Sequence, residues 1–523
     1  MVTVNGMSHA RTRALAAAGI AVGAFVAVSA CAPVPAPTPD YVTDFGKGGR
    51  APSPSGDAGP KGPEWKASAK DPLAWQDCTS RLAGRYGTPP AANATLQCAT
   101  LTVGVGQAEA PLKLSVTRAR VPGTPDAAAP LVLVGGTEFT GQRALSTLAA
   151  GDSPVLANRP VVAVERRGIG TSGALTCRTA DDQSVLRSGG TAGQSLETRV
   201  AKVGESAQKA STTCGDAYAD AISDFTAPAA ADDLEKLRTT WNVPALGLLA
   251  VGDGSTTALA YAAEHPKQVA RLILDSPVRY GGTELQRAED AARGTSATVD
   301  AFAAQCGPTC ALGADPAGAV RAIIDDAAAG RLGSFTDSDV RRAVVVTLGT
   351  GPGDRDARIT RLATALQGAR SGDAAPLRAL LRTADEALGT DGQFVARCSD
   401  AVTKASPDQV LASARKWGPE FRLGAATALD LGTCGAWPTM TAPPKLTDLG
   451  VTSVVATSAA DPLTARTALD TLTGQLTVVG AQPSAVTWAG IGDGAVIRSS
   501  CVQKSLIGYL DKLDAPSTRA CPA

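Results

Sequence analysis

Histidine is the side chain on which most nucleophilic hydrolysis depends, and this chain of 523 residues contains two of them. A serine nucleophile needs an imidazole to take its proton. His9 lies in an amino-terminal segment that we expect to be removed. His265 ends an expected helix and is followed by Pro266, and we expect it at the surface. Neither histidine is therefore expected to act as a catalytic base.

The segment around residue 252 is where a nucleophile would be presented. The apolar run 246–251 predicts a buried strand, and the small-residue segment 255–265 predicts a helix. A sharp turn of the pattern Gly-x-Ser-x-Gly between strand and helix exposes a nucleophilic serine between small residues. The turn in this chain reads Gly252-Asp253-Gly254.

Two side chains next to this turn are alternative nucleophiles. Ser255 would have Asp253 and Thr257 as its flanking residues, which fits the turn poorly, and we expect it to cap the helix. Asp253 would have Val251 at the first small position, and it would still need a histidine to activate water.

Strands and helices alternate on both sides of the turn. This alternation predicts a parallel, doubly wound sheet. The sequence pattern predicts helices over 281–435, and apolar runs typical of strands resume at 451–457 and 485–488. We expect an α/β core whose first part spans 71–280, a helical cap insertion at 281–435, and the second part of the core at 436–523.

Composition excludes several classes of protein. Lys and Arg total 49 and Asp and Glu total 49, so the charges cancel and no nucleic-acid partner is expected. The spacing of Cys306 and Cys310 suits a metal, but no second close pair or nearby histidine completes a site. We expect no metal and no cofactor.

The amino terminus has the features of an export signal. Arg11 and Arg13 precede a short apolar stretch and small residues. Val28-Ser29-Ala30-Cys31 resembles the lipobox of bacterial lipoproteins. We expect a signal peptide at 1–30, a lipid on Cys31, and a flexible Pro-, Gly- and Ser-rich linker at 31–70. This places the protein on the outer face of the bacterial cell membrane; the alternative is ordinary secretion with Cys31 incidental.

Ten cysteines follow Cys31, and an even number in an exported chain predicts disulfides. Several connectivities are open, and we favour the pairs that close short loops. These pairs are Cys78 with Cys98, Cys177 with Cys214, Cys306 with Cys310, Cys398 with Cys434, and Cys501 with Cys521.

Several motifs occur in an order that is similar to one known family. They are Gly135-Gly136-Thr137-Glu138, the stretch from Glu165 to Ser172, Tyr261-Ala262-Ala263-Glu264-His265-Pro266, Asp461-Pro462-Leu463-Thr464, and the cysteine pattern at Cys398, Cys434, Cys501 and Cys521. From about Trp75 to Cys521 the chain resembles the exported tripeptidyl-aminopeptidase-like α/β-hydrolases, relatives of proline iminopeptidases. The resemblance implies an α/β-hydrolase fold, with a mostly parallel doubly wound sheet and an inserted helical cap.

The resemblance also assigns the catalytic positions. The family places a proline fourteen residues after its nucleophile, and counting back from Pro266 leads to Gly252. The acid position holds Asp461. The family's histidine position, in a Gly-x-Gly-His stretch, holds Asp493. Glycine cannot attack, and aspartate, with a reference pKa of about 3.9, is a feeble base near neutral pH.

The oxyanion turn is altered as well. It contains Gly135 and Gly136, but Glu138 stands where the family has a glycine. A carboxylate there would oppose a developing oxyanion. Loss of a triad serine or histidine lowers kcat on the order of 10⁶-fold.

These substitutions predict a lipid-anchored extracellular protein that resembles serine exopeptidases but is catalytically inactive. We expect Asp461 and Asp493 to face each other and to favour a cationic group of a peptide or small ligand, such as a free amino terminus. One alternative role of Asp461 is to cap the turn that follows it. Two other functions stay open: an active hydrolase with rewired catalytic residues, and a cell-envelope scaffold or partner-binding protein.

Overall fold

The computed structural model describes residues 62–523 except 92, 108 and 308. Residues 58–523 form one compact unit. The predicted signal peptide, Cys31 and most of the predicted linker lie outside the described residues. In the described part, every helix is too short or too polar to cross a membrane.

One sheet forms the base of the described unit. Its ten strands lie in the order β1-β2-β3-β5-β4-β6-β7-β8-β9-β10, antiparallel from β1 to β5 and parallel from there on. This is the mostly parallel sheet that the alternating pattern predicts. The strands are β1 (Gln76–Asp77), β2 (Thr95–Val105), β3 (Ala110–Arg120), β4 (Leu131–Val134), β5 (Val161–Val164), β6 (Leu246–Val251), β7 (Val269–Asp275), β8 (Ser453–Ala460), β9 (Pro483–Ile491) and β10 (Ala520–Cys521).

Helices cover both faces of the sheet. Along β4, Leu131 and Leu133 point to one face and Val132 and Val134 to the other, and all four are buried. This is why the strand reads as a continuous apolar run. One face carries α1 (Thr79–Tyr86), α2 (Gly141–Ala149), α3 (Pro154–Asn158), α17 (Ala495–Arg498) and α18 (Ser500–Lys512), and the other carries α6 (Ala227–Trp241), α7 (Gly254–Glu264) and α16 (Arg466–Val478).

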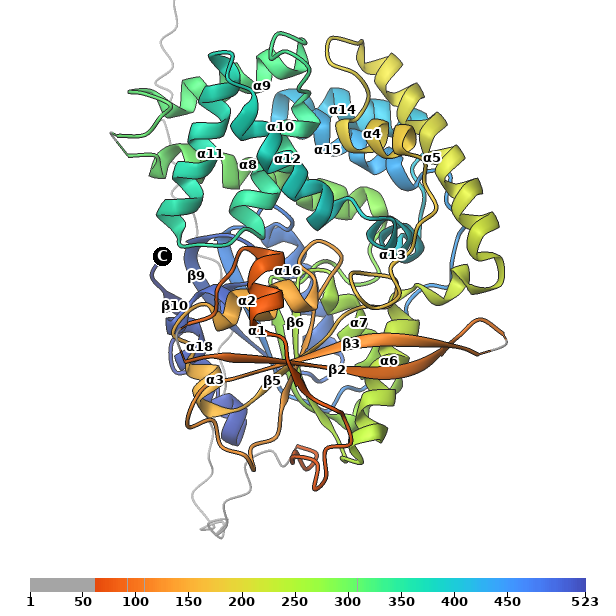
Figure 1. Ribbon diagram of the computed structural model, residues 1–523, viewed down its shortest axis with the longest axis vertical. Coiled ribbons are helices and arrows are strands. Elements are labelled where there is room, and N and C mark those ends of the chain that lie inside the picture. Colours follow the sequence, from red (N-terminus) through yellow and green to blue (C-terminus); the bar gives the residue numbers. More distant parts are fainter. Residues whose placement is uncertain (1–61, 92, 108, 308) are drawn as a thin grey trace, which may run out of the picture. The chain divides into compact units, whose positions relative to one another are not determined.

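A layer of helices, here called the cap, lies beyond one end of the sheet (Figure 1). Most of it comes from the chain between β7 and β8. These helices are α8 (Glu284–Gln305), α9 (Pro316–Ala328), α10 (Asp337–Val344), α11 (Arg355–Arg370), α12 (Ala375–Leu388), α13 (Asp391–Asp400), α14 (Pro407–Glu420) and α15 (Gly424–Leu431), with a π-helical turn, η3 (Val345–Gly349), after α10.

Two helices of the cap come from the part of the chain that the sequence assigns to the core. α4 (Ala180–Ser188) packs on α10, and α5 (Leu196–Tyr218) packs on α14 (Figure 1). Val203 of α5 shares a buried cluster with Phe394 and Trp437. The apolar face of α5 is therefore buried by the cap, which a boundary drawn from sequence alone did not anticipate.

Five disulfides occur in the structure, and they join the same cysteines that the short-loop pairing predicts. Two of them brace the cap. Cys177–Cys214 ties α5 to the loop before α4, and Cys398–Cys434 ties α13 to the 3-10 turn η4 (Gly432–Cys434).

Trp65 falls within the predicted linker, yet it is packed against the body. A Cβ on Gly247, at the amino end of β6, would lie 2.3 Å from the Trp65 ring. The guanidinium carbons of Arg159 and Arg271 lie 4.2 and 5.2 Å from the centre of that ring. The packed body therefore begins before residue 71, at the end of the sheet opposite the cap.

Candidate functional site

The carboxyl ends of four neighbouring parallel strands bring the candidate site together. Gly252 follows β6, Asp275 ends β7, Asp461 follows β8, and Asp493 comes shortly after β9. In open α/β sheets this edge is where ligands bind.

Gly252 stands at the sharp turn between β6 and α7. Its φ is +57°, in the left-handed region, and its N–H donates to the carbonyl of Asp275 at 2.9 Å. A Cβ built on Gly252 would lie 3.2 Å from Oδ2 of Asp493. The structure thus places the residue at the family's nucleophile position next to the residue at its histidine position, in the backbone shape of a nucleophile turn.

Asp493 is a buried carboxyl without a partner. Its side chain is 1 % exposed, and neither Oδ1 nor Oδ2 has a hydrogen-bond partner among the described residues. Burial, with the nearby charges of Asp461 and Asp275, holds its pKa well above the usual range. The surroundings of Asp493 therefore favour its neutral form, in which a carboxyl cannot accept a proton as a general base does.

Asp461 and Asp275 complete a buried acid cluster with Asp493. Oδ1 of Asp461 accepts the N–H of Leu463 at 2.9 Å, so it caps its own turn, while Oδ2 has no partner in the described part of the chain. Oδ2 of Asp275 accepts from Val496 at the start of α17 at 2.9 Å. Burial raises the pKa of Asp461 to about 6 and that of Asp275 to about 7.

Asp275 was not singled out by the sequence analysis. The available signal was an acid directly after the apolar run 269–274, at the edge where the other candidates were expected. Among the described residues, no group of three or more His, Cys, Asp or Glu side chains is arranged to hold a metal ion.

Arg498 is the cation nearest to this acid cluster, but its hydrogen bonds go elsewhere. Its guanidinium donates to backbone carbonyls: Asp493 at 2.9 Å, Gly351 at 3.2 Å and Gly349 at 2.7 Å. Burial lowers the pKa of Arg498 to about 10. Since Gly349 and Gly351 belong to the cap, Arg498 fastens the cap over Asp493.

The loop after β4 meets the turn at Gly252 through Asp253. Both carboxylate oxygens of Asp253 accept the backbone N–H of Thr137, at 2.9 and 3.0 Å, and Oδ2 also accepts the Thr137 hydroxyl at 2.6 Å. In hydrolases of this fold the N–H of this loop and the N–H after the nucleophile form the oxyanion hole. Here the Asp253 carboxylate accepts the N–H of Thr137, so this donor is already occupied by the chain itself.

The predicted oxyanion-turn residues lie around this contact. A Cβ on Gly135 would lie 2.1 Å from the backbone nitrogen of Gly141, so this position requires glycine. A Cβ on Gly136 would lie 1.7 Å from Oδ1 of Asp253, so a side chain there would displace that carboxylate. Oε2 of Glu138 lies 2.9 Å from the Thr137 hydroxyl oxygen and competes with Asp253 for its single proton. Burial and the nearby Asp253 raise the pKa of Glu138 to about 7.

A cavity of about 120 Å³ separates the turn from the cap. Gly252, Asp253 and Glu138 line its floor. Its other charged lining residues are Arg279, Glu284, Arg287, Asp290, Arg341, Arg397, Asp400 and Asp430. Asp461 and Asp493 are not among the described residues that line it. The acids open to this cavity are therefore different from the pair that the sequence singled out.

The other sequence candidates lie away from the cavity. Ser255 is fully buried in the first turn of α7, and its hydroxyl accepts the N–H of Val278 at 3.3 Å instead of capping the helix. His265 is at the opposite end of α7 from Gly252, with its ring 5.0 Å from that of Tyr261. Neither side chain is brought to the site.

Comparisons with known proteins found one matching family model and several similar solved structures. Residues 420–521 match the α/β-hydrolase family model described as TAP-like protein. Similar solved structures include proline iminopeptidase of Mycobacterium smegmatis, at 12% identity and a TM-score of 0.36, with 79% of this chain and 98% of that chain covered. A thermophilic esterase from Thermogutta terrifontis has 11% identity and a TM-score of 0.33, with 79% and 98% covered. No curated protein matches. The TAP-like match and the topology confirm the predicted α/β-hydrolase fold and family resemblance.

Proposed function

We propose that this α/β-hydrolase-fold protein with a TAP-like domain is a non-catalytic binding protein. Its cleft under the cap would receive a ligand that carries a cationic amino group, such as the free amino terminus of a peptide. One observation carries the proposal: the carboxylate of Asp253 occupies the N–H of Thr137 beside a glycine at the nucleophile position.

Three losses at one site argue against hydrolysis. Gly252 offers no nucleophile, and Asp493 is a buried acid where a base is needed. In a serine hydrolase that lacks its triad, a residual acceleration of roughly 10³–10⁴ over water comes from the oxyanion hole and substrate binding. Here the Asp253 carboxylate occupies one hydrogen-bond donor of the oxyanion hole. Even this residual rate acceleration is therefore not expected.

The charges on the cavity floor favour a cation. Among the described residues no arginine forms an ion pair with Asp253 or Glu138, whereas Arg341 and Arg397 in the cavity wall both contact Asp430. An ammonium group brings three donors and one positive charge. It would favour the ionised form of Glu138, and binding should therefore strengthen as pH rises through about 7.

Export and lipid anchoring are part of the proposal. The basic and apolar amino terminus that leads to Cys31 supports them. Five disulfides also suit a protein that folds outside the reducing cytosol. Globomycin treatment of the producing cells, or mass spectrometry of the mature amino terminus, tests the lipid on Cys31 directly.

Titration of the purified protein with trialanine and with N-acetyl-trialanine tests the binding function. We expect the free amine to bind more tightly, by about tenfold or more, and Glu138→Gln to remove much of that preference. Glu205→Gln, an exposed change on α5, is the matched control. Equal binding of both peptides, or binding of neither, would refute the proposal.

A rewired hydrolase is the second candidate, and the buried acids are the observation that favours it. Asp461, with a pKa of about 6, and Asp275, with a pKa of about 7, resemble paired carboxyls of which one is protonated and one ionised. Peptide turnover by the wild-type protein that is lost in Asp461→Ala would establish it. A scaffold without a ligand is a third candidate, which specific peptide binding would rule out.

A further inference from the structure

We propose that a second cavity, next to the first, binds a carboxylate, so that the ligand is a short zwitterionic peptide. Its amino group would lie near Asp253 and Glu138, and its carboxylate among cap arginines. This inference rests on the proposed binding function and adds the second end of the ligand.

The second cavity has a volume of about 90 Å³ and lies between the loop after β4 and the cap. Its wall is rich in arginine: Arg178, Arg187, Arg341, Arg342 and Arg397. It shares Glu138, Arg341, Arg397, Asp430 and Leu463 with the cavity over Gly252. The two cavities are therefore adjacent, and the proposal takes them as the two ends of one binding site.

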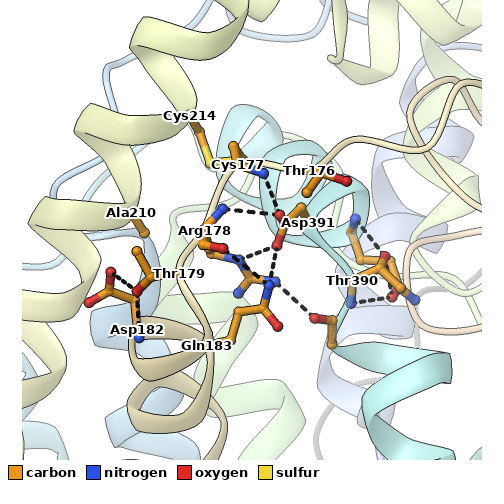
Figure 2. A network of polar contacts seen from close by, with 12 residues as sticks. Thr176, Cys177, Arg178, Thr179, Asp182, Gln183, Ala210, Cys214, Thr390 and Asp391 are labelled. Carbon is orange, nitrogen blue, oxygen red and sulfur yellow. Dashed lines mark hydrogen bonds and ion pairs between the residues drawn. A yellow bond between two sulfur atoms is a disulfide. The ribbon is translucent and has the colours of Figure 1, made fainter.

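Arg178 is a fixed part of this wall. Asp391 accepts hydrogen bonds from the N–H groups of Cys177 and Arg178, from Nε of Arg178 and from the amide of Gln183, at 2.6 to 3.1 Å (Figure 2). The Cys177–Cys214 disulfide holds the same loop to α5 (Figure 2). The charge of Arg178 is therefore paired with Asp391, and we assign this arginine to the shape of the cavity and not to the anion site.

Arg187 and Arg342 share one carboxylate at the cavity wall. Both contact Asp385, Arg187 at 3.4 Å. Arg342 also lies 3.4 Å from Asp339, whose other oxygen is used to cap α10. Nε of Arg187 is buried and has no hydrogen-bond partner among the described residues.

Arg341 and Arg397 share a second carboxylate. They contact Asp430 at 3.4 and 3.1 Å. Nε of Arg341 is also buried without an acceptor in the described part of the chain. Buried donors that lack a partner are rare in native structures and point to a missing acceptor.

The balance of charge selects the kind of anion. Four guanidinium groups, those of Arg187, Arg341, Arg342 and Arg397, contact three carboxylates, those of Asp339, Asp385 and Asp430. Glu138 is a further acid of this wall, and once it pairs with the amino group of the ligand, one positive charge of the arginines is left without a partner. A singly charged carboxylate neutralises it, and arginine suits carboxylates because it can donate two hydrogen bonds to them. A phosphate dianion would leave excess negative charge beside Glu138.

Calorimetric titration with trialanine, its carboxamide and its N-acetyl form tests the inference on the purified protein. We expect amidation to weaken binding by about tenfold or more, because it removes a charge-assisted contact. Arg341→Gln and, separately, Arg187→Gln should weaken trialanine to a similar extent and leave the carboxamide unchanged. Arg415→Gln, an exposed change on the cap, should alter neither.

The outcomes separate the two proposals. If acetylation weakens binding and amidation does not, the carboxylate site is wrong and the amine site stands. If amidation weakens binding and acetylation does not, the amine site is wrong and the carboxylate site stands. If no peptide binds, both are wrong. Competition by inorganic phosphate that is stronger than competition by acetate would overturn the assignment of the anion as a carboxylate. Arg341→Lys keeps the positive charge and should retain most of the binding of trialanine. It therefore shows whether the loss in Arg341→Gln comes from the missing charge or from a failure to fold.

Discussion

The two carboxylate oxygens of Asp253 lie 2.9 and 3.0 Å from the backbone nitrogen of Thr137. A hydrolase that had merely lost its serine would keep an open oxyanion hole. In this chain the residue after the nucleophile position reaches across and takes the donor, so the substitutions at Gly252 and Asp493 are accompanied by a filled anion site.

Restoring the triad alone is therefore expected to fail. Gly252→Ser with Asp493→His supplies a nucleophile and a base beside Asp461, but Asp253 still occupies the N–H of Thr137. Adding Asp253→Ala should raise ester hydrolysis by about 10²–10³-fold over the double variant, the usual effect of one oxyanion donor. Hydrolysis of p-nitrophenyl acetate measures it, and the same triple variant with alanine at position 252 is the control. Equal rates in the double and triple variants would show that Asp253 does not block the site.

Gly252→Ala should destabilise the protein more than its backbone angle alone requires. A φ of +57° costs a non-glycine residue about 1 kcal/mol, and the new Cβ would also lie 3.2 Å from Oδ2 of Asp493. Gly281 has a similar φ of +66° with open space around its Cβ position, so Gly281→Ala is a matched control. Urea unfolding should show the larger loss for Gly252→Ala. Equal losses of stability in the two variants would mean that the Asp493 side chain moves away from the new Cβ at no cost.

The acid cluster should make stability fall as pH rises. The pKa values of Asp461, about 6, and Asp275, about 7, lie above the value of about 3.9 for an unfolded carboxyl, so the folded state holds protons that the unfolded state releases. The stabilisation is complete below about pH 4 and is lost as pH rises through 6 and 7. The pKa of Asp493 is also raised by burial and by the neighbouring acids, so its contribution has the same sign.

Asp493→Asn should reduce this dependence. Because the amide carries no charge to desolvate, we expect the free energy of unfolding at pH 8 to increase on the order of 2 kcal/mol, with a smaller gain at pH 5. Asp232→Asn, on the exposed side of α6, should change neither value appreciably. Stability of the Asn variant that falls with pH as steeply as that of the wild type would contradict the assignment.

Arg498 should hold the cap against the core. Its three hydrogen bonds to backbone carbonyls bridge the loop after β9 and the loop after η3. Arg498→Met removes them and leaves buried carbonyls without donors, and we expect a loss of about 3 kcal/mol. Limited proteolysis should then cut faster near residues 345–353. Arg331→Met, an exposed arginine of the cap, is the control; unchanged cleavage in Arg498→Met would place the cap's attachment elsewhere.

Much of the fold could be predicted from the sequence because the strands are continuous apolar runs. The run that ends at Val251, and the motif that ends at Pro266, fix the register of the turn to Gly252, and the structure gives that residue the left-handed angle such a turn needs. The short-loop rule also selects the five cysteine pairs that the structure forms.

The contacts between charged groups in the site were harder to predict from the sequence. Its charged groups meet only after distant loops close: Thr137 and Asp253 are 116 residues apart in the sequence. The sequence placed Glu138 at the oxyanion turn but gave no sign that Asp253 would accept the N–H of Thr137 in that turn. Arg341 and Arg397 reach the cavity from the cap, and no local pattern predicts which face of α10 or α13 turns toward the sheet.

Trp65 packs against the body close to the first described residue of the chain. It lies at the amino end of β6, whereas Gly252 and the cap lie at the other end of the same strand. If the predicted lipid on Cys31 fixes the protein to a surface, a pull along the tether is borne by Trp65 and its flanking arginines. The cleft lies at the other end of the strand from this attachment, so a pull on Trp65 does not act directly on the residues that line the cleft.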